Sequence, residues 1–138
     1  MKKILFNPIP TTSKFAHPML RILFGLALVN HGLDKFMNFS AYSMDFPDPL
    51  GLGTSLSLGL VVFAELFCGL LLVVGLVTRL ASFIVANTFV VAAFVYHHSD
   101  PFQEKELAIV YLALAFFFLM SGGGKVSLDS KIMNSFHE

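Results

Sequence analysis

The sequence predicts an all-α, polytopic membrane protein: a four-helix bundle with both termini in the cytoplasm. Of its 138 residues, 56% are hydrophobic and 13% are charged, whereas soluble domains carry about 25% charged residues. The mean hydropathy is +0.76. Apolar residues fill four long stretches, at 16–36, 55–76, 80–96 and 107–120. Because a spanning helix needs roughly 20 mostly apolar residues, each stretch predicts one helix.

The first two helices are expected at 17–37 and 54–76. Pro18 suits the first turn of a helix, where the N–H that proline lacks would be unpaired anyway. Gly75 and Thr78 mark the exit from the second helix. Residues 38–53 between the two helices predict turns rather than helix, because they carry Asp45, Pro47, Asp48, Pro49, Gly51 and Gly53.

The third helix is expected at 78–97 and the fourth at 103–121. Only a few residues separate the second helix from the third, so these two must be antiparallel neighbours. Asp100 and Pro101 suit the start of the fourth helix as cap and first residue, and residues 122–124, three glycines, end it. The apolar part of this helix is short, so the alternative is a helix that covers the bundle without crossing fully.

The sequence predicts three segments: an N-terminal segment, a helical domain and a C-terminal tail. Residues 1–15 are expected to be cytoplasmic or interfacial, because Asn7, Pro8 and Pro10 interrupt the place where a signal peptide would be apolar. Residues 16–124 form the four-helix transmembrane domain. Residues 125–138 form a cytoplasmic tail.

The orientation follows from the placement of lysine and arginine. If all four helices span, one side of the membrane receives Lys2, Lys3, Lys14, Arg21, Arg79, Lys125 and Lys131. The other side has only Lys35 and Lys105 among its basic residues. The first side is therefore predicted to be cytoplasmic. In a diderm bacterium the loops at 38–53 and 97–106 would then face the periplasm, and the protein would be a multi-pass protein of the inner membrane.

Composition also excludes some classes of function. The formal net charge is zero, so no basic face suggests a nucleic-acid partner. The single cysteine, Cys68, excludes an internal dithiol relay and is expected to be a buried packing residue.

Glu65 is the most informative polar residue, because it lies about 15 Å from either end of the second predicted helix. At that depth a carboxylate protonates or finds a partner. Asn87 lies at the same depth on the neighbouring helix, so a Glu65–Asn87 hydrogen bond is one hypothesis. The alternative role for Glu65 is a neutral carboxyl that holds helices together.

A second polar group comprises His31, Asp34 and Lys35. Their spacing places Asp34 and Lys35 on or beside the face of His31, near the outer boundary. Lys35 is long enough to extend to that boundary, so an interfacial anchor is the plain interpretation of this residue. It explains His31 less well, because Asn30 and His31 lie deeper in the helix.

A third group lies in the second outer loop and comprises His97, His98, Asp100, Glu104, Lys105 and Glu106. For Glu104 and Lys105, solvated loop charge is the favoured interpretation. No HExxH or CxxC spacing is present, so no metal site is predicted. The open alternative is a bundle that gathers His31, Glu65, a loop histidine and Glu106 around a metal ion.

Several short motifs, in this order and spacing, resemble the DoxX family of small bacterial membrane proteins. They are Arg21-x-x-x-Gly25, His31-Gly32-x-x-Lys35-Phe36, Asp48-Pro49-Leu50-Gly51, Glu65, Gly75-x-x-Thr78-Arg79, His97 to Phe102 with Lys105-Glu106, and Gly122-Gly123-Gly124-Lys125-x-Ser127-Leu128-Asp129. The likeness covers residues 17–130. The family usually has proline where this chain has Gly123.

The resemblance implies a four-helix bundle and a link to quinone-dependent oxidation. We therefore expect a membrane oxidoreductase, or a subunit of one, that uses a quinone-like lipophilic partner and receives electrons from a redox protein. His31 and Glu65 are the expected catalytic residues, and Arg21 and Arg79 the structural ones. The expected substrate-binding residues are Lys35, Asp48, Asn87, His97, Asp100 and Glu106.

Two other functions stay open at this point. One is a non-catalytic subunit that docks or assembles enzymes at the membrane, although the extramembrane segments are short. The other is a transporter of a small solute or of protons, with Glu65 and His31 in the path. Four helices are few for alternating access, so a transporter would require a homo-oligomer.

Overall fold

The structure is a computed structural model that describes residues 13–136, and it confirms the all-α class. The first helix, α2, is Ser13–Met37, followed by the short α3, Phe39–Tyr42. The second long helix is continuous from Thr54 to Val74 and comprises α4 (Thr54–Val62), a π-helical turn η1 (Phe63–Phe67) and α5 (Cys68–Val74). Next come α6 (Thr78–Val90) with its π-helical end η2 (Val91–Tyr96), α7 (Phe102–Ser121) and α8 (Leu128–Ser135).

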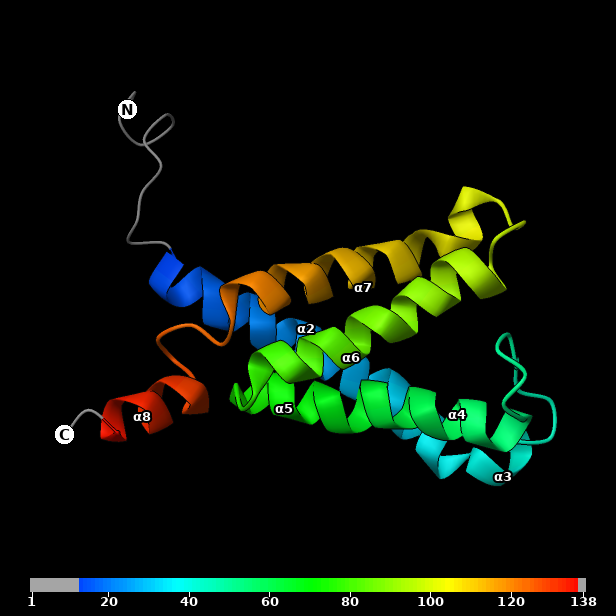
Figure 1. The fold of residues 1–138 in the computed structure, drawn as a ribbon, viewed down its shortest axis with the longest axis horizontal. Helices are drawn as coiled ribbons and strands as arrows, with labels where there is room; N and C mark the ends of the chain where they lie inside the picture. Colours follow the sequence, from blue (N-terminus) through cyan, green and yellow to red (C-terminus); the bar gives the residue numbers. More distant parts are fainter. Residues whose placement is uncertain (1–12, 137–138) are drawn as a thin grey trace.

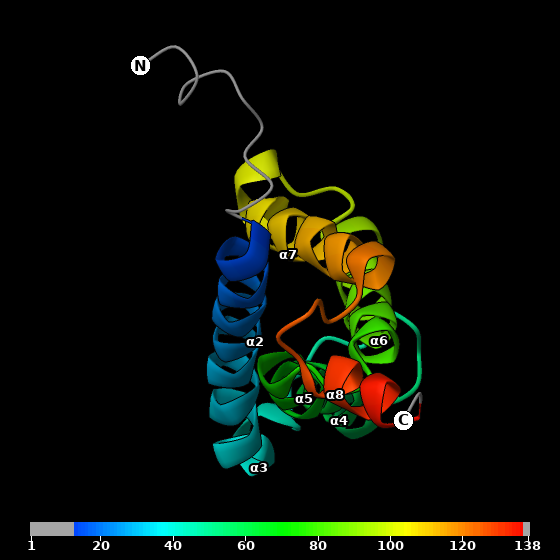
Figure 2. The same cartoon turned by 90° about the vertical axis from the view of Figure 1, so that its left-hand side faces the viewer.

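The long helices surround a common axis, as Figure 2 shows for α2, α4–α5, α6 and α7. One end of the bundle, here called the loop end, carries the connections 43–53 and 97–101. The opposite tail end carries residues 75–77 and 122–127. Figure 1 shows α6 and α7 diverging from α4 and α3 toward the loop end. The bundle is therefore closed at its tail end and splayed at its loop end.

The core of the bundle consists of small and aromatic side chains from all four long helices. Phe24 and Leu28 of α2 meet Cys68 and Leu72 of α5, with further buried residues from α6, η2 and α7. The Phe24 ring stacks on the Phe118 ring of α7 at a centroid distance of 6.0 Å. Cys68 is fully buried here, in agreement with a packing role.

Two helices, Thr54–Val74 and Thr78–Tyr96, are long and apolar enough to cross a membrane. Only 44% and 39% of these stretches are buried inside the bundle, whereas a core helix of a soluble protein is mostly buried. Large side chains on them, such as Phe67, Leu80 and Phe94, are 50%, 59% and 60% exposed. Because burying such surface is favourable, these faces fit lipid contact.

Two expectations about helix starts were wrong. Pro18 lies inside α2 rather than in its first turn, because the helix extends from Ser13; as the sixth residue it lacks the N–H that would bond to the Lys14 carbonyl. Asp100 does not cap α7. The N-cap is Pro101, without a side-chain hydrogen bond, and the Asp100 carboxylate is paired with His97 instead.

Two short helices were not predicted. In the stretch expected to be turns only, α3 extends the α2 helix, because Asn38 donates to the Asp34 carboxylate and carbonyl and so supports another turn. In the tail, α8 begins where Ser127 Oγ accepts the Ser130 N–H at 3.1 Å, a standard N-cap contact.

Candidate functional site

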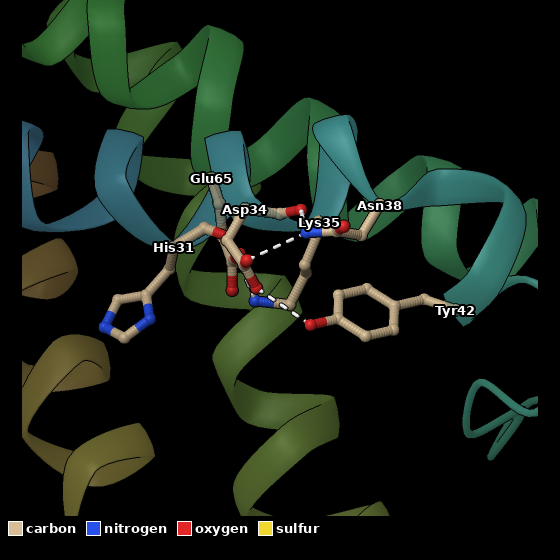
Figure 3. Close-up of polar contacts among 6 residues, drawn as sticks. All are labelled: His31, Asp34, Lys35, Asn38, Tyr42 and Glu65. Carbon is tan, nitrogen blue, oxygen red and sulfur yellow. Dashed lines mark hydrogen bonds and ion pairs between the residues drawn. The ribbon is translucent and has the colours of Figure 1, made fainter.

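An ion pair joins two of the long helices near the loop end. Lys35 Nζ of α2 lies 2.7 Å from Glu65 Oε2 of η1, and the two side chains are 23% and 8% exposed. A second, longer contact of 3.5 Å runs from Lys35 Nζ to the His31 carbonyl oxygen. Figure 3 shows the Lys35 amino group turned toward Glu65. The Lys35 side chain therefore extends into the bundle. The interpretation of Lys35 as an interfacial anchor predicted that it would extend outward to the membrane boundary.

Close approach of the two backbones positions this pair. A Cβ on Gly32 would lie 2.8 Å from Leu66 Cα and 2.9 Å from the Glu65 carbonyl carbon, so only glycine permits this contact. Glu65 itself belongs to the π-helical turn η1, a feature that is frequent at functional sites and changes the direction of the side chains it contains. Lys35 follows Gly32 by one turn and reaches Glu65 from the same face.

The hydrogen bond to the Glu65 carboxylate comes from Lys35, not from His31. Its half-buried ring packs edge-on against the Tyr111 ring of α7, at a centroid distance of 5.9 Å. In Figure 3 the ring points away from Lys35 and Tyr42. His31 and Tyr111 both lie within electrostatic range of the Glu65 carboxylate. Lys35 is thus the direct partner of Glu65, and His31 is a more distant neighbour.

Asp34 forms a separate polar cluster on the outer side of Lys35. Its carboxylate accepts hydrogen bonds from Asn38 Nδ2 at 3.0 Å and from the Tyr42 hydroxyl at 3.1 Å. The hydrogen bond to this carboxylate raises the pKa of Tyr42 above its ordinary value. This cluster fixes α3 against the end of α2.

A cavity of about 560 Å³ opens between the second and third long helices, beneath the 43–53 loop. Its wall is mostly apolar, with Phe46, Leu60, Phe63, Phe83 and Phe89 among the lining residues. Lys35 and Glu65 belong to the wall, together with Ser57, Asn87, Thr88, Tyr96 and His97. The site is thus a mostly apolar cavity with an ion pair in one wall.

The loop over the cavity is held by Asp48. The Asp48 carboxylate accepts hydrogen bonds from Ser57 Oγ, Gly53 N and Leu52 N at 2.7, 2.7 and 2.9 Å. The Ser57 bond, followed by the Gly53 bond, holds the pKa of Asp48 below its usual range. Through these contacts the Asp48 carboxylate holds the loop in its conformation. Asp48 itself does not line the cavity.

The other expected binding residues are divided between the cavity and the surface. His97 lines the cavity, and its Nδ1 lies 2.6 Å from Asp100 Oδ2. Asn87 also lines the cavity, but its amide donates to the Phe83 carbonyl at 2.7 Å. The hypothesis of a Glu65–Asn87 hydrogen bond is therefore wrong. Glu106 is exposed on α7 and is not among the lining residues.

The metal-binding alternative is not supported by the arrangement. Within residues 13–136, no three His, Cys, Asp or Glu side chains group as a metal ion requires. Neither His31 nor Glu106 is among the residues that line the cavity with His97, and Glu106 is exposed.

The two arginines lie at the tail end of the bundle. Arg21 is 2% exposed; its guanidinium donates to the Gly123 carbonyl and, at 3.0 Å, to the Val126 carbonyl. Arg79 donates to the Met120 carbonyl at 3.3 Å. Arg21 thus holds the segment after α7 onto the bundle, and Arg79 holds the last turn of α7; both contacts are structural.

Sequence reasoning missed Tyr42 and Tyr111, and it did not predict the contact that Asp129, the last residue of the DoxX-like ending, makes. The Tyr42 hydroxyl donates to Asp34 and the Tyr111 ring packs against His31, yet each is an isolated tyrosine with no motif around it. Asp129 accepts the backbone N–H groups of Val77 and Thr78 at 2.7 and 3.0 Å. It thereby caps α6 from the tail, a contact between residues about fifty positions apart that no local pattern reveals.

The fold and the exposed apolar helices define an α-helical membrane protein. The family model of DoxX matches residues 17–98, more than half of the chain. This chain therefore belongs to the DoxX family, and the predicted resemblance is confirmed. The match ends before Asp100-Pro101-Phe102 and the glycine-rich ending.

One curated relative shows the same likeness. A protein of Haemophilus influenzae, described as uncharacterized, is 31% identical over 119 residues, which are 81% of this chain and 87% of that protein. No solved structure matches the chain.

Proposed function

We propose that this chain is a multi-pass protein of a bacterial inner membrane that binds a quinone-like lipophilic molecule in the cavity beside Lys35 and Glu65. It acts there as an oxidoreductase, or as the quinone-binding subunit of one. The observation that carries the proposal is the position of the Lys35–Glu65 ion pair in the wall of a large and mostly apolar cavity. A quinone has the matching shape, because polar oxygens project from an apolar ring and tail.

The proposed topology is a bundle of four spanning helices with both termini in the cytoplasm. Two helices are long and apolar enough by themselves. α2 and α7 pack against them along the same axis and expose large apolar side chains, such as Leu23 and Phe116 at 53% and 50%. Under this topology, the cavity lies on the periplasmic half of the membrane.

The residues present fit a quinone head group. The Lys35 ammonium donates hydrogen bonds and can hold a carbonyl oxygen or a phenolate. The Glu65 carboxylate accepts a hydrogen bond from a hydroxyl group, so the pair recognises both the oxidised and the reduced form. His97, paired with Asp100, places a second titratable group on the cavity wall. A quinone accepts two electrons and two protons, and a redox protein would supply the electrons.

The position of the polar groups favours this function over the two alternatives. A transporter needs polar groups distributed along its path. The buried polar groups here form two separate sets instead, one with Lys35 and Glu65 and one at the tail end with Arg21, Thr78, Ser82 and Ser127, and apolar core residues such as Leu28, Cys68 and Leu72 lie between them. A docking subunit needs an extramembrane surface, and the connections between the long helices are short. A ligand-binding role accounts for both the cavity and the ion pair.

Equilibrium binding of a short-chain quinone to the detergent-purified protein tests the proposal. Calorimetric titration with decylubiquinone should show saturable binding, and Lys35→Met should weaken it about tenfold, as expected for the loss of one charge-assisted hydrogen bond. Glu104→Gln, an exposed change on α7, is the matched control and should leave the affinity unchanged. Absence of saturable binding to the wild-type protein would refute the function.

A further inference from the structure

A second pocket lies on the other side of Lys35. It measures about 420 Å³. Asp34, Tyr42 and Asp45 form its polar side, and Lys35, Phe46 and Pro47 separate it from the first cavity, since all three line both. We call it the outer pocket. Lys35 of the ion pair is thus accessible from two sides, from the apolar cavity and from the polar outer pocket.

The polar side of the outer pocket has the character of a water-filled entrance. Asp34, Tyr42 and Asp45 are all exposed, and Tyr42 donates its hydroxyl hydrogen to Asp34. Lys35 follows Asp34 directly in the chain and is the only basic residue of the lining. Water in such a pocket has two carboxylates, a hydroxyl and an ammonium as hydrogen-bond partners, which meets the two to four groups that ordered water needs.

We propose that the outer pocket is the route by which protons from the aqueous phase reach the Lys35–Glu65 pair, while the lipophilic ligand occupies the apolar cavity. This inference rests on the proposed function. Lys35 is the positioning residue between the two compartments, because its side chain is part of both walls and its amino group holds Glu65.

The proton step balances without any change in the pair. A hydronium ion in the outer pocket gives up one proton, and an anionic oxygen of the bound ligand gains one. Lys35 and Glu65 finish with the charges with which they started. The other charged and titratable groups around the pair are Asp34, Tyr42 and Asp45 in the outer pocket, His97 in the apolar cavity, and His31 and Tyr111 within electrostatic range of Glu65.

A coloured acidic quinone makes this route measurable. The probe is a 2-hydroxy-3-alkyl-1,4-naphthoquinone, whose anion absorbs visible light more strongly than its neutral form. The probe is first bound to the protein as its anion at high pH, and the complex is then mixed rapidly with acidic buffer. The colour fades as a proton reaches the bound probe. Its equilibrium affinity is measured separately, so failure of binding refutes the proposed function before the proton route is tested.

The outer pocket is blocked through Ala41, an exposed residue of its lining. Ala41→Cys is labelled with a charged methanethiosulfonate reagent. Wild-type protein is the unlabelled reference, because Cys68 is fully buried. Gln103→Cys, exposed at the same end but outside both linings, is the labelled control.

Labelling at Ala41→Cys should slow the loss of colour about tenfold or more, equivalent to ~1.4 kcal/mol of barrier, with little change in affinity. Labelling at Gln103→Cys should change neither quantity. An unchanged rate in the blocked protein would overturn the inference, as would a cysteine at position 41 that the reagent cannot reach. If Ala41→Cys fails to fold, Asp45→Cys serves in the same assay, and the unlabelled Asp45→Cys protein is then the reference because this change itself removes a carboxylate of the pocket.

Discussion

At the scale of single residues, the Lys35–Glu65 pair dominates the energetics of the site. Removing one member of a buried pair leaves an uncompensated charge, which costs about 3–5 kcal/mol. Replacing both members with apolar side chains removes that penalty. The pair therefore contributes little net stability as a unit and much specificity, because it determines where the two helices meet.

We therefore expect Lys35→Met to lower the free energy of unfolding by about 3 kcal/mol. The double variant Lys35→Met with Glu65→Leu should recover most of this loss. Reversible unfolding in mixed micelles measures both values, and Glu104→Gln is the surface control. Additive losses in the double variant would show that the two side chains do not interact.

Asp48 predicts a pH dependence at the loop end. Its hydrogen bonds lower its pKa in the folded state relative to the unfolded state. A lowered folded-state pKa means that its stabilisation is fully present above the unfolded pKa, near ~4, and is lost as the pH falls through the folded value. Wild-type protein should thus melt above Asp48→Asn at neutral pH, and the difference should narrow in acid.

Thermal unfolding in detergent between neutral pH and about pH 3 checks this behaviour. Asp45→Asn, a neighbouring loop residue without these contacts, is the control. A difference between wild type and Asp48→Asn that grows in acid would contradict the assignment.

Sequence reasoning identified Glu65 and Lys35 as notable but did not predict that they bind each other. Both residues lie in apolar stretches of the sequence, where a charged side chain is easily recognised. Their pairing depends on the close backbone contact at Gly32 and on the π-helical turn around Glu65. The first is a tertiary contact and the second has no reliable local signature. For the same reason, Asn87 was assigned a partner that it does not have.

At the scale of elements, helix packing depends on glycines whose neighbours leave no room for a Cβ. Gly32 is one such residue, and Gly59 of α4 is the opposite case, since a Cβ there would meet nothing within 4 Å. The two positions thus form a matched pair for testing the packing of α2 against η1.

We expect Gly32→Ala to destabilise the protein by about 1–3 kcal/mol, the usual cost of overpacking. Gly59→Ala should instead stabilise it by about 0.5–1 kcal/mol, because alanine is the better helix former. Chemical unfolding of both variants in micelles provides the comparison. Equal effects at the two positions would rule out a specific close contact at Gly32.

The turn between α5 and α6 contains a strained residue. Val77 has φ 43° and ψ 41°, a left-handed conformation that costs L-residues roughly 1–2 kcal/mol and that asparagine tolerates better. Its side chain is 46% exposed, so little packing is lost on substitution. Val77→Asn should therefore raise the melting temperature, whereas Val126→Asn, the same change at an exposed residue without positive φ, should not.

The long helices were predictable because each has a strong local cause. Apolar length determines their interiors, and Gly75 and Gly122, both with positive φ, end two of them. Their starts were harder to predict, as Pro18 and Asp100 show. The short helices α3 and α8 depend on side-chain contacts of Asn38 and Ser127 within polar segments, where composition alone favours turns.

At the scale of the whole molecule, the distribution of charge predicts how the bundle lies in the membrane. The basic residues near the tail end include Arg21, Arg79, Lys125 and Lys131, and Asp45, Asp48 and Asp100 lie at the loop end. By the positive-inside rule, we expect the tail end to lie in the cytoplasm.

Reporter fusions test this orientation. A fluorescent protein fused after Glu138 should fold and fluoresce, because it stays in the cytoplasm. Alkaline phosphatase fused within the 43–53 loop, as a truncation after Leu50, should be active, because that loop is exported. Inactive phosphatase at that position, together with activity at a fusion after Leu76, would reverse the proposed topology.

The cap that Asp129 places on α6 has a consequence for biogenesis. The N–H groups of Val77 and Thr78 emerge from the ribosome about fifty residues before the carboxylate that satisfies them. During synthesis, the start of α6 therefore has only water or lipid head groups as partners. Closure of this end must therefore wait until Asp129 has been synthesised, so a nascent chain that is stalled before Asp129 would lack this cap and remain susceptible to proteases at the α5–α6 hairpin.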